Sequence, residues 1–136
     1  ESKGFSMHRI LIVSPHRWRL ADFAQSLAEQ QDIQVAWAED GTAAIADVMK
    51  HPPLAVIIDH NLPDIPGLDL VRRLLPINAM INTVVISDLS PENFHDAGEG
   101  LGIMAQLPLD PAKSDALEVL SRIRRLSPPD FSQSSK

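Results

Sequence analysis

The stretch LAVIIDHNLPDIPG, residues 54–67, joins a short apolar run to a polar loop that holds two prolines and a glycine. An apolar, β-branched run that ends at an acid, Asp59, is typical of a buried strand leading into a loop. Four similar runs are RILIV (9–13), IQVAWA (33–38), NTVVIS (82–87) and GIMAQL (102–107). Because these runs are mostly continuous rather than alternating, they predict a parallel sheet covered on both faces.

The segments between these runs carry apolar residues at helical spacing. The first is Leu20, Phe23, Ala24, Leu27 and Ala28; others cover 44–48 behind an Asp40 cap, 71–75, and about 111–126. The helix around Phe94 is expected to be short, because Gly98 and Gly100 each cost about 1 kcal/mol in a helix interior. This (βα)₅ order predicts an α/β, doubly wound sheet of strand order 2-1-3-4-5, since crossovers between parallel strands are right-handed.

The composition indicates a single domain without a strongly basic surface. The chain has 136 residues, 44% of them hydrophobic, a net charge of −6 and no cysteine. These values argue against nucleic-acid binding driven by charge, and against disulfides or thiolate metal sites. No apolar run is long enough to span a membrane, so we expect a cytoplasmic protein. Residues 1–6 are interpreted as a foreign or disordered leader, 7–126 as the domain, and 127–136 as a tail or linker.

Polar residues at the ends of the expected strands should meet in one crevice, because the carboxyl ends of parallel strands lie at one edge of the sheet. They include Asp59 and Ser87, with Pro63 and Gly67 in the loop that follows Asp59. With the five-unit alternation, this pattern resembles the receiver (CheY-like) domain of two-component response regulators, over nearly the whole span from His8 to Leu126. The resemblance implies a flavodoxin-like fold, a histidine kinase or other signalling protein as partner, and Asp59 as the candidate phosphoacceptor.

The sequence departs from the receiver pattern at several crevice positions. Receivers carry two adjacent acids after strand one that bind Mg²⁺, and Ser14 and Pro15 occupy those places. The lysine expected after strand five falls on Leu109, or on Asp110 if the register shifts by one. The aromatic residue of the family's switch falls on Gln106, and the small residue after the strand-four hydroxyl falls on Asp88.

These departures predict a degenerate pseudo-receiver that acts by protein contact, with no cofactor, no metal, no catalytic residue and no enzymatic turnover. The alternative is a functional receiver that accepts a phosphoryl group from a histidine kinase on Asp59 with the help of Mg²⁺. A homodimer through the fourth helix, fifth strand and fifth helix is also possible. Acids at 92, 96 and 99 and arginines at 122, 124 and 125 can pair there, either within one chain or across a two-fold axis.

Two further sets of residues allow more than one interpretation. Arg17 and Arg19 flank Trp18, and their guanidinium groups either replace the missing metal by pairing with Asp59 or Asp88, or lie on a solvated helix face, which we prefer. His16, His60, Asp59 and Asp88 can approach one another, but lack a diagnostic metal-ligand spacing. No Gly-x-Ser-x-Gly turn or glycine-rich phosphate loop is present, which disfavours a hydrolase or a dinucleotide-binding protein.

Overall fold

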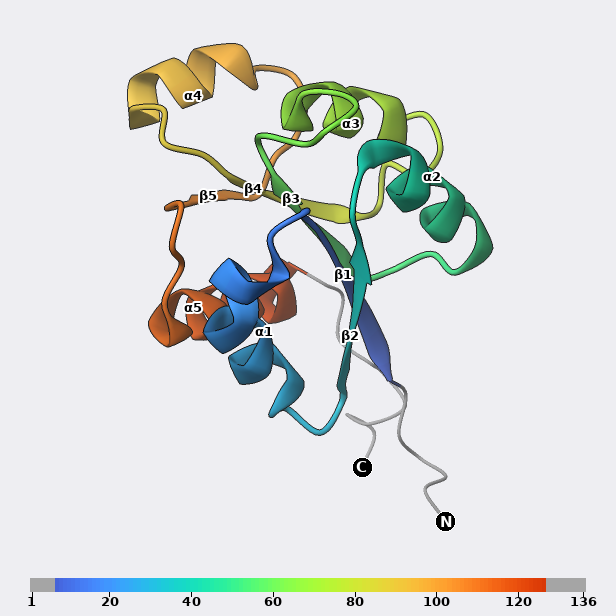
Figure 1. The fold of residues 1–136 in the computed structure, drawn as a ribbon, viewed down its shortest axis with the longest axis vertical. Helices are drawn as coiled ribbons and strands as arrows, with labels where there is room; N and C mark the ends of the chain where they lie inside the picture. The colour runs from blue at the N-terminus through green and yellow to red at the C-terminus, as the bar shows by residue number, and fades with distance from the viewer. Residues whose placement is uncertain (1–6, 127–136) are drawn as a thin grey trace.

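The computed structural model describes residues 7–126, so the interpretations of 1–6 and 127–136 lie outside the described residues. Its five strands are β1 (His8–Val13), β2 (Ile33–Ala38), β3 (Ala55–Asp59), β4 (Asn82–Ile86) and β5 (Ala105–Leu107). They form one parallel sheet in the order β2-β1-β3-β4-β5 (Figure 1). The predicted doubly wound α/β fold is confirmed.

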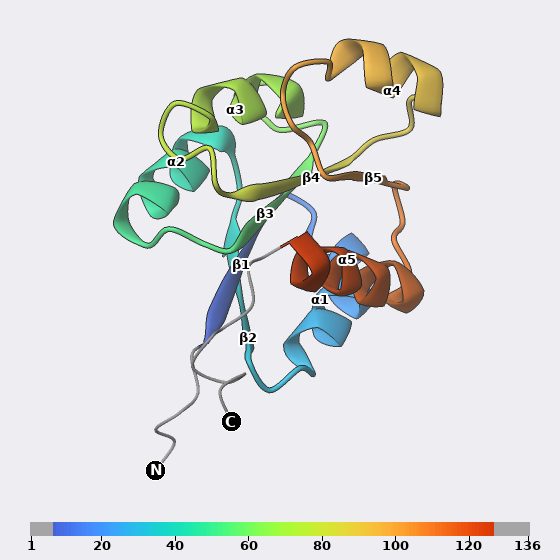
Figure 2. The same ribbon diagram turned by 180° about the vertical axis from the view of Figure 1, so that it is seen from behind.

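Helices cover both faces of the sheet. They are α1 (Ala21–Ala28), preceded by the 3₁₀ turn η1 (Arg17–Leu20), α2 (Gly41–Lys50), α3 (Gly67–Leu74), α4 (Pro91–Ala97) and α5 (Lys113–Leu126). Figures 1 and 2 show α1 and α5 together on one face and α2 and α3 on the other. No helix within residues 7–126 is both long and apolar enough to cross a membrane.

Two apolar cores lie between the helices and the sheet, because successive side chains of a strand point to opposite faces. On the α1 and α5 side, Ile12 and Ile57 pack with Phe23 and Ile123. On the α2 and α3 side, the core contains Leu11, Val13, Val56, Ile58, Val48, Leu70 and Leu74. All five residues of β3 are buried, so the central strand is fixed from both sides up to its last residue, Asp59.

The elements near the carboxyl end of the chain are shorter than the sequence predicts. The fifth strand covers Ala105–Leu107 rather than 102–107, because Gly102 has a φ of 68°, which an extended strand cannot contain. The last helix begins at Lys113 rather than near Pro111. The fourth helix is short, as predicted: the Ser90 side chain accepts a hydrogen bond from the Asn93 amide at its start, and Gly98 caps its end.

Candidate functional site

Asp59, the last residue of β3, is buried and bonded to the end of β1. The Ser14 hydroxyl donates a hydrogen bond of 2.9 Å to Asp59 Oδ2. Ser14 is itself buried, and its Oγ accepts a hydrogen bond from the His16 amide at 3.0 Å. The serine therefore occupies one oxygen of the carboxylate and is held in that orientation by the loop that follows β1.

Arg19 approaches the same oxygen. Its Nη2 lies 3.4 Å from Asp59 Oδ2, and its Nε lies 3.9 Å from Asp110 Oδ1 in the β5–α5 loop. The preferred interpretation, that both arginines lie on a solvated helix face, is thus wrong for Arg19. A 3₁₀ turn advances about 120° per residue, so residues 17 and 19 point in different directions. Arg17 lies instead over the Trp37 ring, 5.1 Å from its centroid.

The second carboxylate oxygen of Asp59 faces the start of the β3–α3 loop. Asp59 Oδ1 accepts a hydrogen bond of 3.3 Å from the Asn61 amide. His60 Nδ1 lies 3.4 Å from the same oxygen, an ion pair when the imidazole is protonated, but it lacks hydrogen-bond geometry. Both oxygens of the buried carboxylate therefore have partners from this chain.

Gly67 closes the β3–α3 loop back onto β3. Its amide donates a hydrogen bond to the His60 carbonyl at 3.0 Å. A Cβ at this position would lie 2.7 Å from the Asp59 carbonyl oxygen and 2.9 Å from His60 Cα. Gly67, which lacks a Cβ, thus permits a close backbone approach beside Asp59. The two prolines of the predicted crevice, Pro15 and Pro63, are exposed in their loops.

Asp64 is a structural carboxylate of this loop that the sequence analysis missed. It accepts hydrogen bonds from the Gly41 and Thr42 amides, both 2.9 Å, and from the Thr42 hydroxyl at 3.0 Å. The hydrogen bond from the Gly41 amide, together with those from the amide and the hydroxyl of Thr42, lowers the pKa of Asp64 from 3.8 to about 2. Because the two segments are more than twenty residues apart, no local sequence pattern reveals the contact. Asp64 joins the loop after β3 to the first turn of α2.

This contact predicts a specific loss of stability in acid. The folded state lowers the pKa of Asp64, so its contribution is present above about pH 4 and is lost as the pH falls toward 2. We expect the melting temperature of the wild type to fall more steeply over this range than that of Asp64→Asn. Asp96→Asn, at an exposed acid of α4, is the control and should follow the wild type. Parallel curves for wild type and Asp64→Asn would contradict the assignment.

The loop after β4 is tied down by β5. The Ser87 hydroxyl accepts a hydrogen bond of 3.1 Å from the Leu89 amide. The Gln106 side chain donates hydrogen bonds to the carbonyl oxygens of Ser87, at 3.2 Å, and Leu89, at 2.8 Å. Asp88 between them is exposed, and Leu109 packs against the α1 and α5 core. Gln106 therefore fixes this loop to β5 through two hydrogen bonds, which we call the Gln106 bracket.

Two arginines of α5, Arg122 and Arg124, contact residues outside α4. Arg122 donates to the Met104 carbonyl at 3.0 Å and lies 3.4 Å from Glu118. Arg124 donates to Asp32 at 3.2 and 3.3 Å, and this hydrogen bonding lowers the pKa of that carboxyl. Among residues 7–126, no ion pair joins an acid of α4 to an arginine of α5. The predicted pairing within one chain is therefore not formed there.

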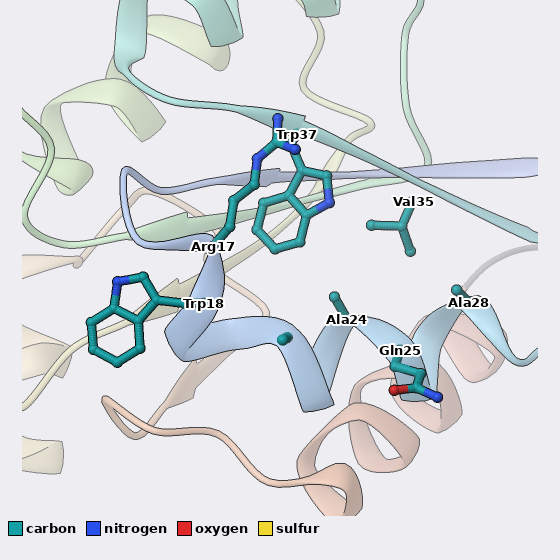
Figure 3. Close-up of a pocket in the computed structure, with 8 residues that line it drawn as sticks. Arg17, Trp18, Ala24, Gln25, Ala28, Val35 and Trp37 are labelled. Carbon is teal, nitrogen blue, oxygen red and sulfur yellow. The ribbon is translucent and has the colours of Figure 1, made fainter.

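A shallow groove of about 400 Å³ lies between α1 and the edge strand β2 (Figure 3). Trp18 at its rim is 76% exposed, and Arg17 covers Trp37. The residues that line it are Arg17, Trp18, Ala21, Ala24, Gln25, Ala28, Val35 and Trp37. The groove includes none of the groups that contact Asp59, so Arg17 belongs to this surface and Arg19 to the crevice.

Comparison with known proteins agrees with this fold. The family model described as "Response regulator receiver domain" matches residues 10–118 of this chain. A response regulator receiver protein of Anaeromyxobacter sp. (strain Fw109-5) is 33% identical over 105 residues, which are 75% of this chain but 42% of that protein. The chain thus spans less than half the length of that relative.

Solved receiver structures have the same fold. The chemotaxis response regulator CheY4 of Vibrio cholerae is 19% identical, with a TM-score of 0.76, over 87% of this chain and 99% of that one. A CheY-like receiver domain protein of Methanospirillum hungatei is also 19% identical, with a TM-score of 0.78, over 88% and 96%. The chain belongs to the response regulator receiver domain family, whose members are signalling modules of two-component systems.

Proposed function

We propose that this domain is a pseudo-receiver, which signals through contacts with other proteins without a phosphoryl group on Asp59. The observation that carries the proposal is the occupied Asp59 carboxylate. Ser14 and Arg19 both contact Oδ2, and the Asn61 amide contacts Oδ1. A carboxylate nucleophile needs a free oxygen and a cation that also binds the incoming phosphoryl group. In this crevice, both carboxylate oxygens already have partners from the chain, and the cation, Arg19, is engaged with one of them.

The residues around Asp59 do not fit the Mg²⁺ ion that the family implies. Mg²⁺ is usually held by one or two carboxylates together with water. At the end of β1, Ser14 supplies a neutral hydroxyl whose hydrogen already points at Asp59, and Pro15 has only a backbone carbonyl. The Arg19 guanidinium beside Asp59 Oδ2 would repel a divalent cation. The described part of the chain holds no group of three or more His, Cys, Asp or Glu residues suited to a metal.

The loop after β5 also lacks the positive charge that phosphoryl transfer uses. Leu109, at the lysine position, packs against the core on the α1 and α5 side. Asp110, the next residue, brings a negative charge to the same loop. An approaching phosphoryl group would therefore meet repulsion from Asp110 without a lysine to offset it.

The proposal predicts no acyl phosphate on Asp59. The protein is incubated with acetyl phosphate and Mg²⁺, beside a phosphorylatable receiver as a positive control, and its intact mass is measured. We expect the wild-type mass to stay unchanged. An adduct of one phosphoryl group that Asp59→Ala abolishes would instead establish the competing candidate, a functional receiver with a histidine kinase as donor.

The partner in this proposal is a histidine kinase or another signalling protein, in the cytoplasm. The Gln106 bracket supports signalling by contact, because its two hydrogen bonds hold the loop before α4 without a phosphoryl group on Asp59. The homodimer through α4, β5 and α5 stays a prediction.

A further inference from the structure

The buried Asp59 carboxylate requires a positive partner in the folded protein. Its side chain is 1% exposed, and a buried charge without a partner costs several kcal/mol. Ser14 and the Asn61 amide contribute hydrogen bonds but no charge. Among residues 7–126, the permanent cation that pairs with Asp59 is Arg19, whose side chain is 27% exposed and whose Nη2 lies 3.4 Å from Oδ2. A guanidinium keeps its charge at every physiological pH.

Two other basic residues near the crevice fill this role less well. His60 reaches the other oxygen of Asp59, but its side chain is 37% exposed and carries a charge only when protonated. Arg17 lies over the Trp37 ring and belongs to the groove beside β2. Arg19 is thus the group that neutralises Asp59 independently of pH.

Arg19 also reaches a second element. Its Nε is buried without a hydrogen-bond partner and lies 3.9 Å from Asp110 Oδ1, in the loop between β5 and α5. Asp110 is 80% exposed, so this contact is weaker than the one to Asp59. One side chain from η1 therefore connects the end of β3 to the β5–α5 loop.

We infer that Arg19 is the resident cation of the crevice, a positioning residue that joins η1, β3 and the β5–α5 loop in one arrangement without metal or phosphoryl group. The inference rests on the proposed function and names the contacts that would hold the crevice in one arrangement. Arg19 would replace the positive charges that the receiver pattern implies, namely the bound Mg²⁺ ion and the lysine after the fifth strand. The positive charge here comes from the first helical turn, and the acid, Asp110, stands in the fifth loop.

The test is a double-mutant cycle between Arg19→Gln and Asp59→Asn, with Arg17→Gln as the matched control and Arg19→Lys as the conservative variant. Melting temperatures are measured, and backbone amide shifts of Asp110 and Ala112 are followed by NMR. We expect Arg19→Gln to lower the melting temperature of the wild type by about 5 °C or more and that of Asp59→Asn by much less. Arg19→Lys should recover part of the loss, and the two loop amides should shift in Arg19→Gln but not in Arg17→Gln.

Equal effects of Arg19→Gln in both backgrounds, or no shift of the loop amides, would overturn the inference. These outcomes leave the proposed function untouched, because that proposal fails only if wild-type Asp59 takes up a phosphoryl group. The two failures are therefore measured separately.

Discussion

Ser14→Asp should destabilise the domain by about 3–5 kcal/mol relative to Ser14→Asn, the matched uncharged control. The Ser14 hydroxyl lies 2.9 Å from Asp59 Oδ2, so an aspartate would place a second carboxylate against the first in a buried position. Arg19 already neutralises Asp59, and the new charge has no partner. Chemical denaturation of the two variants measures the difference.

The same variant also tests why the end of β1 lacks acids. Adding Mg²⁺ should recover part of the stability of Ser14→Asp, because two carboxylates can share a divalent cation. Mg²⁺ should have no such effect on the wild type or on Ser14→Asn. If Ser14→Asp is as stable as Ser14→Asn in the absence of metal, the crevice tolerates a second acid and our account of its charge balance is wrong.

Gly67→Ala should cost about 1–3 kcal/mol, because the added Cβ meets backbone rather than a movable side chain. It would lie 2.7 Å from the Asp59 carbonyl oxygen and 2.9 Å from His60 Cα, so β3 or α3 must shift. Gly98→Ala is the control, since its Cβ meets the flexible end of Ile103 at 3.0 Å and comes no nearer to backbone than 3.3 Å, at the Phe94 carbonyl oxygen. Equal unfolding free energies for the two variants would contradict the close approach.

The fold could be predicted from the sequence because the signal is local and repeated. Runs such as 54–59 are continuous and β-branched, and the helical spacing between them is clear, so the order of strands follows from general rules of chain crossing. The Asp40 cap of α2 is confirmed, with its side chain accepting from the Ala43 amide. The prediction was wrong for the start of the fifth strand, where Gly102 adopts a positive φ that no apolar pattern reveals.

The site could be predicted only in part. The sequence analysis singled out Ser14 from the resemblance to receivers, and the structure places it beside Asp59, because β1 and β3 are paired up to Val13 and Ile58. Arg19 was assigned to the wrong surface, since its direction depends on the 3₁₀ turn that begins α1. Asp64 was missed, since its partners, Gly41 and Thr42, come from another element. Contacts between loops depend on how the helices and strands pack together, and no local pattern in the sequence reveals that packing.

The central claim, that this crevice holds one arrangement without metal or phosphoryl group, is tested most directly by amide NMR with Mg²⁺ and beryllofluoride, which mimics a phosphoryl group on aspartate. The signals of Asp59, Ser87 and Gln106 are the reporters, because they cover the carboxylate and the bracketed loop. Our account predicts a spectrum unchanged by either addition. Saturable shifts of these three signals that vanish in Asp59→Asn would contradict it.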